Sequence, residues 1–340
     1  MLAAYTELKN AEKVKIYLVK KKILDNHHLP VKEFGKIYFP LIKNIKVQNA
    51  EIVNTRFSFP ENERPLTIDE LLKDTLTKKE LGLLPRSQEI VGEIMILEIP
   101  ESLQDKEKLI AEAYLKTNKN IKTVVKKDEF HSGIYRTRKV RVLAGKRSKE
   151  TIHHENGVKI KLHLEKTYFS ARSGNERLRI AKQVKNKEEI LVMFSGAAPY
   201  PLVLAKNSSA KMIYGVELNL LAHQYALGNV YLNNLNDKIA IFHGDVRKII
   251  PKIKKNFDRI VMPLPKTGEE FLDIALRKAK KNTIIHLYAF LEEKEINKYA
   301  LKIKKICTGL KHPVEVLRKV KCGQFSPGTF RVCFDLKVLK

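Results

Sequence analysis

Residues 166–340 alternate short apolar runs with longer stretches in which apolar positions recur with a helical period. Short apolar runs are typical of buried β-strands, and the helical period indicates amphipathic helices. The apolar runs predict strands at residues 190–194, 212–216, 239–243, 259–262 and 283–288. The amphipathic stretches predict helices at residues 220–232, 246–250, 269–280 and 292–305. Repeated strand–helix units indicate an α/β domain with a mostly parallel, doubly wound sheet.

Two further apolar runs close the chain, at residues 314–321 and 331–339. The segment between them, residues 322–328, contains Gly323 and Gly328, which favours a turn. We therefore expect an antiparallel hairpin at one edge of the sheet.

Residues 64–165 mix helix and strand signals without this repeat, which predicts an α+β unit. Thr67 is placed to cap a helix, and Glu70 follows it with the spacing of a capping box. A second helix is predicted at residues 106–116, and strands at residues 90–99, 123–127, 134–143 and 158–164. Lysine and arginine are abundant from residue 131 to residue 161, as on a strand pair that faces RNA or on an ordinary polar sheet face.

The first 63 residues form a third unit, in which short apolar runs are mixed with lysines. Residues 59–65 contain two prolines among polar residues and are typical of a linker. The sequence thus predicts three domains, with boundaries 1–63, 64–165 and 166–340.

Charge is the feature of the composition that bears most on function. The chain has 65 lysines and arginines against 38 aspartates and glutamates, a net charge of +27, and most of the excess lies in residues 166–340. Such an excess favours a polyanionic partner, because each phosphate contact releases bound counterions. Lysine-rich chains are also common in thermophiles, so the charge indicates a polyanionic partner only together with a matching functional site.

Other features of the composition exclude several classes of protein. No run approaches the ~18 apolar residues of a membrane-spanning helix, and the N-terminus lacks a signal-type apolar stretch. Cys307, Cys322 and Cys333 lie far apart and form no Cys-x-x-Cys, which disfavours a disulfide framework and a zinc site built from cysteines. We expect a cytoplasmic protein, monomeric and without a membrane segment.

The ends of the first three predicted strands carry the candidate chemistry, because ligands of doubly wound sheets bind there. Phe194 ends the first strand, and Gly196 follows in a turn that can approach a ligand closely. Glu217 ends the second strand and can accept hydrogen bonds from both ribose hydroxyls of a nucleoside. Asp245 and Val246 follow the third strand and can contact adenine. This is the layout of S-adenosylmethionine-dependent methyltransferases, although helix capping would also explain both acids.

Four stretches of the chain carry a resemblance to a known family, at residues 131–138, 168–177, 193–202 and 262–266. The second, Tyr-Phe-Ser-x-Arg-x-x-x-Glu-Arg, is the most specific of them. On these motifs the chain resembles the archaeal tRNA (guanine37-N1)-methyltransferases over residues 64–340. The resemblance implies a class I methyltransferase domain of Rossmann-like fold, preceded by α+β RNA-binding domains. It also implies methyl transfer from S-adenosylmethionine to N1 of guanosine 37, beside the anticodon, with the first domain on the outer corner of tRNA.

The resemblance also implies roles for individual residues. Glu176 matches the general base that removes the N1 proton, and Arg136 matches the cation that stabilises charge on the guanine O6. The alternative explanation of Glu176 is an ordinary charge at the start of a helix. The alternative explanation of Arg136 is an arginine on a surface strand. The cofactor-binding set comprises Arg177, Phe194, Gly196, Glu217, Leu218, Asp245, Val246 and Pro263. The substrate-binding set, around a base flipped out of its stack, comprises Tyr168, Phe169, Arg172, Pro263 and Lys266. The transfer requires no metal, and we expect none.

Two departures from the family pattern lie at strand ends. Pro263 stands where many members have an asparagine that reads the guanine, and proline offers no such donor. Residues 197–201 also depart from the commoner glycine-rich turn. Both departures resemble a branch that additionally methylates C7 of 4-demethylwyosine, a guanine-derived tricyclic base, at the same nucleotide.

Three other functions are alternatives to methyl transfer. The first is transfer of the aminocarboxypropyl group of the same cofactor, by a paralogue of similar fold in the wyosine pathway. The second is non-catalytic RNA binding on a degenerate Rossmann scaffold. The third, an NAD-linked oxidoreductase, is disfavoured because the Gly-x-Gly-x-x-Gly pattern is absent.

Overall fold

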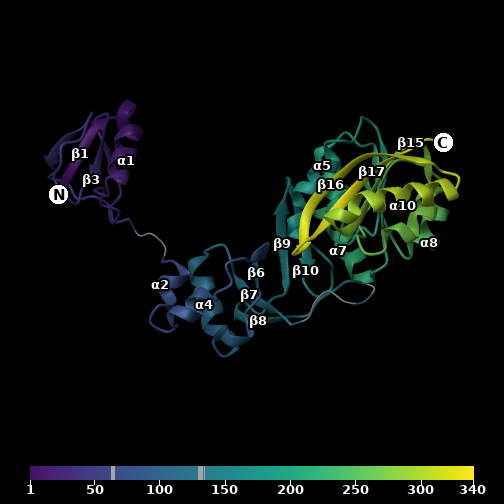
Figure 1. Cartoon of the computed structure of the whole chain (residues 1–340), viewed down its shortest axis with the longest axis horizontal. Helices are drawn as coiled ribbons and strands as arrows, with labels where there is room; N and C mark the ends of the chain where they lie inside the picture. The colour runs from purple at the N-terminus through teal and green to yellow at the C-terminus, as the bar shows by residue number, and fades with distance from the viewer. Residues whose placement is uncertain (63–65, 129–132, 134) are drawn as a thin grey trace. The chain divides into compact units, whose positions relative to one another are not determined.

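The computed structural model describes residues 1–62, 66–128, 133 and 135–340. The chain divides into two compact units, Met1–Glu70 and Leu71–Lys340 (Figure 1). The predicted linker at residues 59–65 lies partly outside the described residues. The division of the chain into three domains, with its boundary at residue 165, stays a prediction.

The first unit is a small antiparallel sheet with one helix. The sheet has the order β2-β3-β1-β4, with β1 (Leu2–Glu7) paired to both β3 (Lys36–Pro40) and β4 (Glu51–Asn54), and with β2 (Val31–Glu33) at the edge. The helix α1 (Ala11–Lys20) buries Val14 and Leu18, four residues apart on one face. These two side chains belong to a core that also contains Ala4 and Phe39. The unit therefore has an apolar core of its own.

The helix α2 (Ile68–Leu72) spans the boundary of the two units, and the second unit continues with short helices and a four-stranded mixed sheet. The helices are α3 (Lys78–Gly82) and α4 (Glu107–Thr117). The sheet has the order β5-β6-β7-β8, with β5 (Glu89–Val91), β6 (Ile94–Leu97), β7 (Thr123–Lys127) and β8 (Val140–Gly145). The predicted capping box is confirmed, because the Glu70 carboxylate accepts the Thr67 N–H at 2.8 Å and the Thr67 hydroxyl accepts the Glu70 N–H at 3.3 Å.

Two strand predictions in this region were wrong in extent. Residues 90–99 form two strands instead of one, because Gly92 turns the chain at φ +56°. A β-carbon there would lie 2.3 Å from Thr151 Oγ1, so only glycine fits the turn. The predicted strand 134–143 begins at Val140, since residues 135 and 136 lie in a turn and Ile134 lies outside the described residues. The sequence analysis also missed β9 (Glu150–Glu155), which pairs with β10 (Val158–His163) and whose alternation is obscured by exposed polar residues.

The large sheet of the second unit has seven strands, in the order β13-β12-β11-β14-β15-β17-β16. Its strands are β11 (Glu189–Met193), β12 (Met212–Glu217), β13 (Ile239–His243), β14 (Phe257–Met262), β15 (Ala279–Glu292), β16 (Val314–Ser326) and β17 (Thr329–Val338). Strands β11 to β15 pair in parallel, and β17 pairs antiparallel with β15 and β16. The predicted doubly wound sheet and its edge hairpin are therefore confirmed. The strand order reverses beside β11, between β12 and β14, which is where a ligand site is expected.

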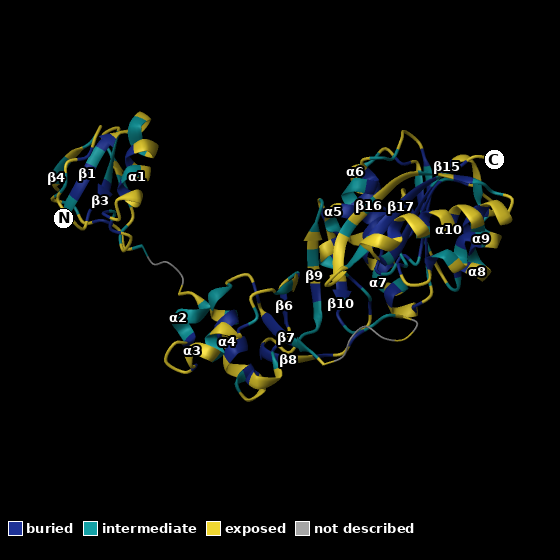
Figure 2. Ribbon diagram, in the orientation of Figure 1, coloured by how far each residue is buried: buried dark blue, intermediate teal, exposed yellow. Residues whose placement is uncertain are grey.

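Helices cover both faces of this sheet (Figure 1). They are α5 (Gly174–Ala181), α6 (Pro199–Asn207), α7 (Leu220–Leu232), α8 (Val246–Ile249), α9 (Leu272–Leu276) and α10 (Ile296–Gly309). Shorter 3-10 turns lie at Leu8–Asn10, Glu101–Lys106, Ala171–Ser173, Ile250–Lys252, Gly268–Phe271 and Glu293–Glu295. Ile190 and Val192 of β11 join the apolar cluster on one face, and Leu191 and Met193 join the cluster on the other. This alternation places the core on both sides of β11, and helices such as α10 keep an exposed outer side (Figure 2).

The helix α6 replaces the turn that the sequence analysis expected at residues 197–201. Pro199 occupies its first position, where the missing N–H costs nothing, and Ala198 precedes it at φ +68°. The helix is buried on all sides over its first seven residues, so it has no amphipathic pattern to detect. The predicted helix 269–280 was also too long, because α9 ends at Leu276 and β15 begins at Ala279 with an exposed, polar stretch.

Candidate active site

A cavity of about 500 Å³ opens at the carboxyl ends of β11 to β14, beside the switch in strand order. We call it the strand-end cavity. Its lining includes Gly133, Tyr135, Arg136, Tyr168, Phe194, Gly196, Glu217, Leu218, Asn219, Asp245, Val246, Arg247, Pro263, Leu264, Lys266 and Phe271. Ten of the residues predicted from sequence to form the site thus line one cavity. They are Arg136, Tyr168, Phe194, Gly196, Glu217, Leu218, Asp245, Val246, Pro263 and Lys266.

Glu217 lies at the end of β12 and is held by backbone N–H groups. Gly196 N donates to Oε2 at 2.6 Å, and Asn219 N donates to Oε1 at 2.8 Å. Burial raises the pKa of Glu217, and the hydrogen bonds from Asn219 and Gly196 oppose this shift. The carboxylate is therefore fixed in direction at the cavity wall, where it can accept hydrogen bonds from a ligand.

The turn after β11 brings the backbone to the cavity. Phe194 and Gly196 have φ values of +56° and +58°, a left-handed conformation that favours glycine. Phe194 packs edge-on against Phe271, with ring centroids 4.9 Å apart. The turn thus presents a backbone N–H to Glu217 and an aromatic ring to the cavity.

Asp245 both caps a helix and lines the strand-end cavity. Its Oδ1 accepts the Arg247 N–H at 2.8 Å, at the start of α8. The capping explanation from the sequence analysis is therefore correct, and it coexists with a position facing the ligand space. Val246 is buried behind it, whereas Leu218 is exposed at the cavity edge.

Arg136 lies between aromatic rings at the mouth of the cavity. Its guanidinium carbon is 5.6 Å from the centroid of Tyr168 and 6.0 Å from that of Phe290. Its backbone has φ +52° in a turn, so the prediction of a strand position for Arg136 was wrong. Burial lowers the pKa of Arg136, with a smaller contribution from the positive charge of Arg331. His131 and Ser132, which belong to the same sequence motif, lie outside the described residues.

A second, smaller cavity adjoins the first, and we call it the inner cavity. It is lined by Tyr168, Phe169, Ser170, Ser173, Arg177, Phe194, Ser195, Gly196, Pro199, Tyr200, Pro263, Pro265, Tyr288 and Arg331. Four residues line both cavities, namely Tyr168, Phe194, Gly196 and Pro263. Ser195 Oγ and Arg331 Nε are buried without a hydrogen-bond partner among the described residues. Because buried polar atoms are normally paired, these two indicate room for a polar ligand.

Glu176 lies in α5 behind the inner cavity and is not among the described residues that line it. Arg179 donates to both of its oxygens, from Nε at 2.7 Å and from Nη2 at 2.8 Å. Tyr288 donates its hydroxyl to Oε1 at 2.6 Å. Tyr288, which does line the cavity, thus separates Glu176 from the ligand space.

The other two arginines of the motif lie in different environments. Arg177 is buried at the inner cavity, where its guanidinium pairs with Glu155 and packs over Phe169 at 5.2 Å. Its charge is therefore already balanced. Arg172 is exposed and does not belong to the described lining of either cavity.

Comparison with known proteins decides the family. Residues 151–317 match the family described as the TRM5/TYW2 methyltransferase domain, and residues 68–148 match the TYW2 N-terminal domain. A Pyrococcus abyssi protein named tRNA (guanine(37)-N(1))-methyltransferase Trm5b is 33% identical over 99% of both chains. The chain belongs to the TRM5/TYW2 methyltransferase family.

Other members of the TRM5/TYW2 family differ in their named reactions. A Nanoarchaeum equitans protein named tRNA (guanine(37)-N(1))/4-demethylwyosine(37)-methyltransferase Taw22 is 33% identical, over 66% of this chain and 91% of its own. A Pyrococcus horikoshii protein named tRNA(Phe) (4-demethylwyosine(37)-C(7)) aminocarboxypropyltransferase is 31% identical, over 80% and 96%. The solved complex of aTrm5 and tRNALeu superposes with a TM-score of 0.76 at 27% identity, and covers 99% of this chain and 100% of that one.

A buried polar network, which the sequence analysis did not find, supports the site of this TRM5/TYW2 protein. Arg179 donates to Asp335 at 2.8 Å as well as to Glu176, and Asp335 bonds to His286 at 2.7 Å. Cys333 lies with His286 and Asp335 in a group of possible metal ligands within the described chain. The His286 ring, however, contacts Asp335 through Nδ1 and Arg259 through Nε2, so both of its nitrogens are already engaged.

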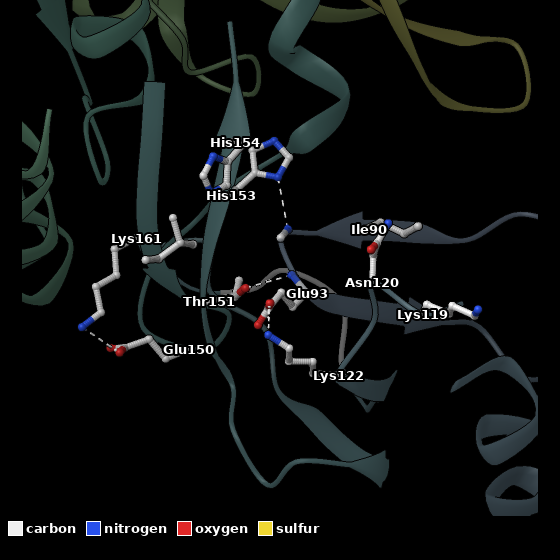
Figure 3. A pocket seen from close by; sticks show the side chains of 12 residues that line it. Ile90, Glu93, Lys119, Asn120, Lys122, Glu150, Thr151, His153, His154 and Lys161 are labelled. Carbon is white, nitrogen blue, oxygen red and sulfur yellow. Dashed lines mark hydrogen bonds and ion pairs between the residues drawn. The ribbon is translucent and has the colours of Figure 1, made fainter. Parts of the chain in front are cut away.

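A third depression lies where the β9–β10 pair meets β5 and β6 (Figure 3). Its charged groups pair with one another, Lys161 with Glu150 at 2.9 Å and Lys122 with Glu93. Thr151 and His153 accept backbone N–H groups of Glu93 and Gly92, at 3.0 and 3.2 Å. These contacts join the two sheets, so we assign this depression a structural role.

No helix in the described part of the chain is long and apolar enough to cross a membrane.

Proposed function

We propose that this protein transfers a methyl group from S-adenosylmethionine to N1 of guanosine 37 in tRNA. The observation that carries the proposal is the shared wall of the two cavities, at Tyr168, Phe194, Gly196 and Pro263. A nucleoside-binding cavity and a second polar cavity that meet in this way bring a donor and an acceptor together. The full-length similarity to a named guanosine-37 methyltransferase supports the same reaction.

The residues of the strand-end cavity fit S-adenosylmethionine. Glu217 would accept the ribose hydroxyls, since its carboxylate is fixed by two backbone N–H groups and faces the cavity. Asp245 and Val246 would contact the adenine, and the Gly196 turn allows the close approach. When bound, the cofactor supplies an activated methyl group on a positively charged sulfur.

The inner cavity, with a volume of about 60 Å³, would receive the Watson–Crick edge of the target base, whose ring would lie in the adjoining strand-end cavity. Tyr168 offers an aromatic wall, and Ser195 Oγ and Arg331 Nε offer polar atoms that lack partners among the described residues. Arg136 is placed beside Tyr168 to stabilise negative charge on the guanine O6 as N1 loses its proton. Glu176 is the final proton acceptor in this proposal.

Positive charge extends well beyond the cavities and fits a tRNA partner. The net charge of +27 supports contact with many phosphates, and Lys266 and Arg172 are exposed near the site. We assign the anticodon stem-loop to the second unit and the outer corner of tRNA to the first unit, in a monomeric complex.

Aminocarboxypropyl transfer is the second candidate, favoured by the match of residues 68–148 to the TYW2 N-terminal domain. The two reactions cleave different carbon–sulfur bonds of the cofactor and leave different products. Incubation with tRNA that carries either guanosine or 4-demethylwyosine at position 37, followed by mass spectrometry of the small molecules, separates them. We expect S-adenosylhomocysteine, and methylthioadenosine as the main product would contradict the proposal.

The same assay extends to tRNA that carries 4-demethylwyosine at position 37. Pro263 lines both cavities and provides no side-chain hydrogen bond that would select guanine. We therefore propose that the tricyclic base is a second acceptor, and methylation of both tRNAs is the expected result. Methylation of guanosine alone would restrict the enzyme to one substrate.

A further inference from the structure

We propose that the hydroxyl of Tyr288 carries the proton of guanine N1 to Glu176. This inference rests on the proposed function, because it assumes that the Watson–Crick edge of a guanine enters the inner cavity. It adds a catalytic residue that neither the sequence motifs nor the named relatives indicate.

Glu176 is too enclosed to take the proton directly. Its side chain is only 3% exposed, and it does not belong to the described lining of the inner cavity. Arg179 occupies both carboxylate oxygens, and Tyr288 donates to one of them as well. A base in the inner cavity therefore meets Tyr288 before it can meet Glu176.

Tyr288 has the contacts that a proton relay needs. Its hydroxyl donates to Glu176 Oε1 at 2.6 Å and accepts from the Tyr200 hydroxyl at 3.0 Å. Because Tyr200 donates to the Tyr288 oxygen, the hydrogen bonds run in one direction, and the Tyr288 proton points at Glu176. A phenol oxygen has a second acceptor position, which leaves one for the N1–H of a base.

The sheet register explains why these groups meet. Strands β15 and β17 pair antiparallel, with His286 opposite Asp335, Tyr288 opposite Cys333 and Phe290 opposite Arg331. Alternate residues of each strand point to the same face, so these side chains form two adjacent rows on one face. The helix α5 packs on this face and contributes Glu176 and Arg179, three residues apart.

Uptake of a proton by Glu176 would not leave an unbalanced charge in the cluster. Arg179 is one cation shared by two carboxylates, Glu176 and Asp335. Arg259 is paired with Glu188, so its charge is already balanced. Protonation of Glu176 would leave Arg179 paired with Asp335 alone, without an unbalanced buried charge.

Tyr288 stays neutral while it transfers the proton. Burial raises the pKa of Tyr288 well above its ordinary value, so a free tyrosinate does not form at neutral pH. The titratable and charged groups that face the pair are Arg177 and Arg179 on α5, Tyr200 on α6, Cys322 on β16, and Cys333 and Asp335 on β17. Burial raises the pKa of both cysteine thiols, which therefore stay protonated and do not compete for the proton.

The proposed step is balanced in atoms and electrons. The N1 proton moves to the Tyr288 oxygen while the Tyr288 proton moves to Glu176 Oε1, so the tyrosine is neutral before and after. The electron pair left on N1 forms the bond to the methyl carbon. The bond from that carbon to the sulfonium sulfur breaks, and its electron pair stays on sulfur.

The test compares single-turnover methylation of guanosine-37 tRNA by Tyr288→Phe, Glu176→Gln and the double variant. Each single variant should be slower than wild type by about 10²–10⁴-fold, with cofactor and tRNA affinities within about threefold. Because both residues act on one proton, the double variant should be no slower than the slower single variant. The relay would be overturned if the rate losses of the single variants multiplied in the double variant. A Tyr288→Phe rate within threefold of the wild-type rate would also overturn it.

A pH profile separates a lost relay from a damaged structure. Guanine N1 loses its proton to solvent as the pH rises towards its own pKa, so the deficit of Tyr288→Phe should shrink with increasing pH. A deficit that is constant with pH would show a structural role and contradict the relay. Tyr299→Phe is the matched control, since Tyr299 donates to Glu269 at 2.7 Å in the same way, and neither residue belongs to the described lining of either cavity.

Two further outcomes decide the remaining cases. If Tyr288→Phe does not fold, Tyr200→Phe replaces it, because this change removes only the donor that directs the Tyr288 proton. The single-turnover rate of Tyr200→Phe should be at least fivefold below that of wild type at neutral pH. A wild-type rate in this variant would overturn the relay. A wild-type protein that leaves guanosine 37 unmethylated would contradict the proposed function and the relay together, whereas the variant results contradict the relay alone.

Discussion

Glu217 shows how a single half-buried acid can set the affinity for a nucleoside ligand. Its carboxylate is oriented by Gly196 and Asn219 before any ligand arrives. A charge-assisted hydrogen bond in such a place contributes roughly 1.5–3 kcal/mol. Glu217→Ala should therefore weaken S-adenosylmethionine binding by about ten- to a hundredfold in calorimetry. Unchanged affinity in a folded variant would remove Glu217 from the site.

The same residue predicts a pH dependence of cofactor binding. Burial raises the pKa of Glu217, so the carboxylate is protonated at a higher pH than that of an ordinary glutamate. Affinity should be constant above the raised pKa and should fall as the pH decreases through it, since the acid can no longer accept from both hydroxyls. Glu217→Gln is the control, and its weaker affinity should not change over the same acidic range. An equal acidic loss in both proteins would assign the titration to another group.

Pro263 carries the prediction about substrate choice, because it lines both cavities. Pro263→Asn restores an amide that can pair with guanine and that a tricyclic base leaves unpaired, at a cost of about 1–3 kcal/mol. Guanosine methylation should persist while methylation of 4-demethylwyosine falls, as measured on both tRNAs with one preparation. Equal losses would show that Pro263 only shapes the end of β14.

At the scale of elements, Asp335 joins β17 to α5 and β15. Burial alone would raise its pKa, but the hydrogen bonds from His286 and Arg179 hold the pKa of Asp335 well below its usual range. Asp335→Asn removes the carboxylate that accepts from both Arg179 and His286, and a neutral amide cannot replace both contacts, so the variant should lower the free energy of unfolding by roughly 1–3 kcal/mol. Urea unfolding measures this loss, and the partly exposed Asp258, which binds Lys280, gives a control variant, Asp258→Asn, with a smaller expected effect.

The direction of the pH effect follows from the lowered pKa. Stability from Asp335 is complete above the pKa of an unfolded aspartate, and it is lost as the pH falls through the lower pKa of the folded state. Wild type should therefore lose stability in acid more steeply than Asp335→Asn does. Parallel acid profiles would show that Asp335 does not anchor these elements.

The elements differ in how well the sequence predicts them. The helix α7 has the predicted bounds, Leu220–Leu232, because an asparagine cap and a length of several turns mark it clearly. The buried helix α6 and the turn at Gly92 were missed, since neither has a pattern of polar and apolar positions. The strand-end residues of the cofactor site were found because their spacing follows the strands. Tyr288 and Arg331 were not, because only the pairing of β15 with β17 brings them to the site.

At the scale of the whole molecule, charge predicts how tRNA binding responds to salt. With a net charge of +27 on the chain, we expect several phosphate contacts. For 6–10 contacts, affinity falls by about 10³–10⁵-fold between 50 and 200 mM salt. A linear plot of log affinity against log salt over this range is the expected result of filter binding. An affinity insensitive to salt would contradict the electrostatic account of tRNA binding.

The central claim, that guanine N1 at position 37 receives the methyl group, has a direct test. The measurement is nucleoside mass spectrometry of tRNA after incubation with the protein and S-adenosylmethionine, using transcripts with guanosine or adenosine at position 37. The account predicts one 1-methylguanosine per guanosine-37 transcript and none in the adenosine-37 control. A methylated nucleoside of another kind, or 1-methylguanosine in both transcripts, would contradict it.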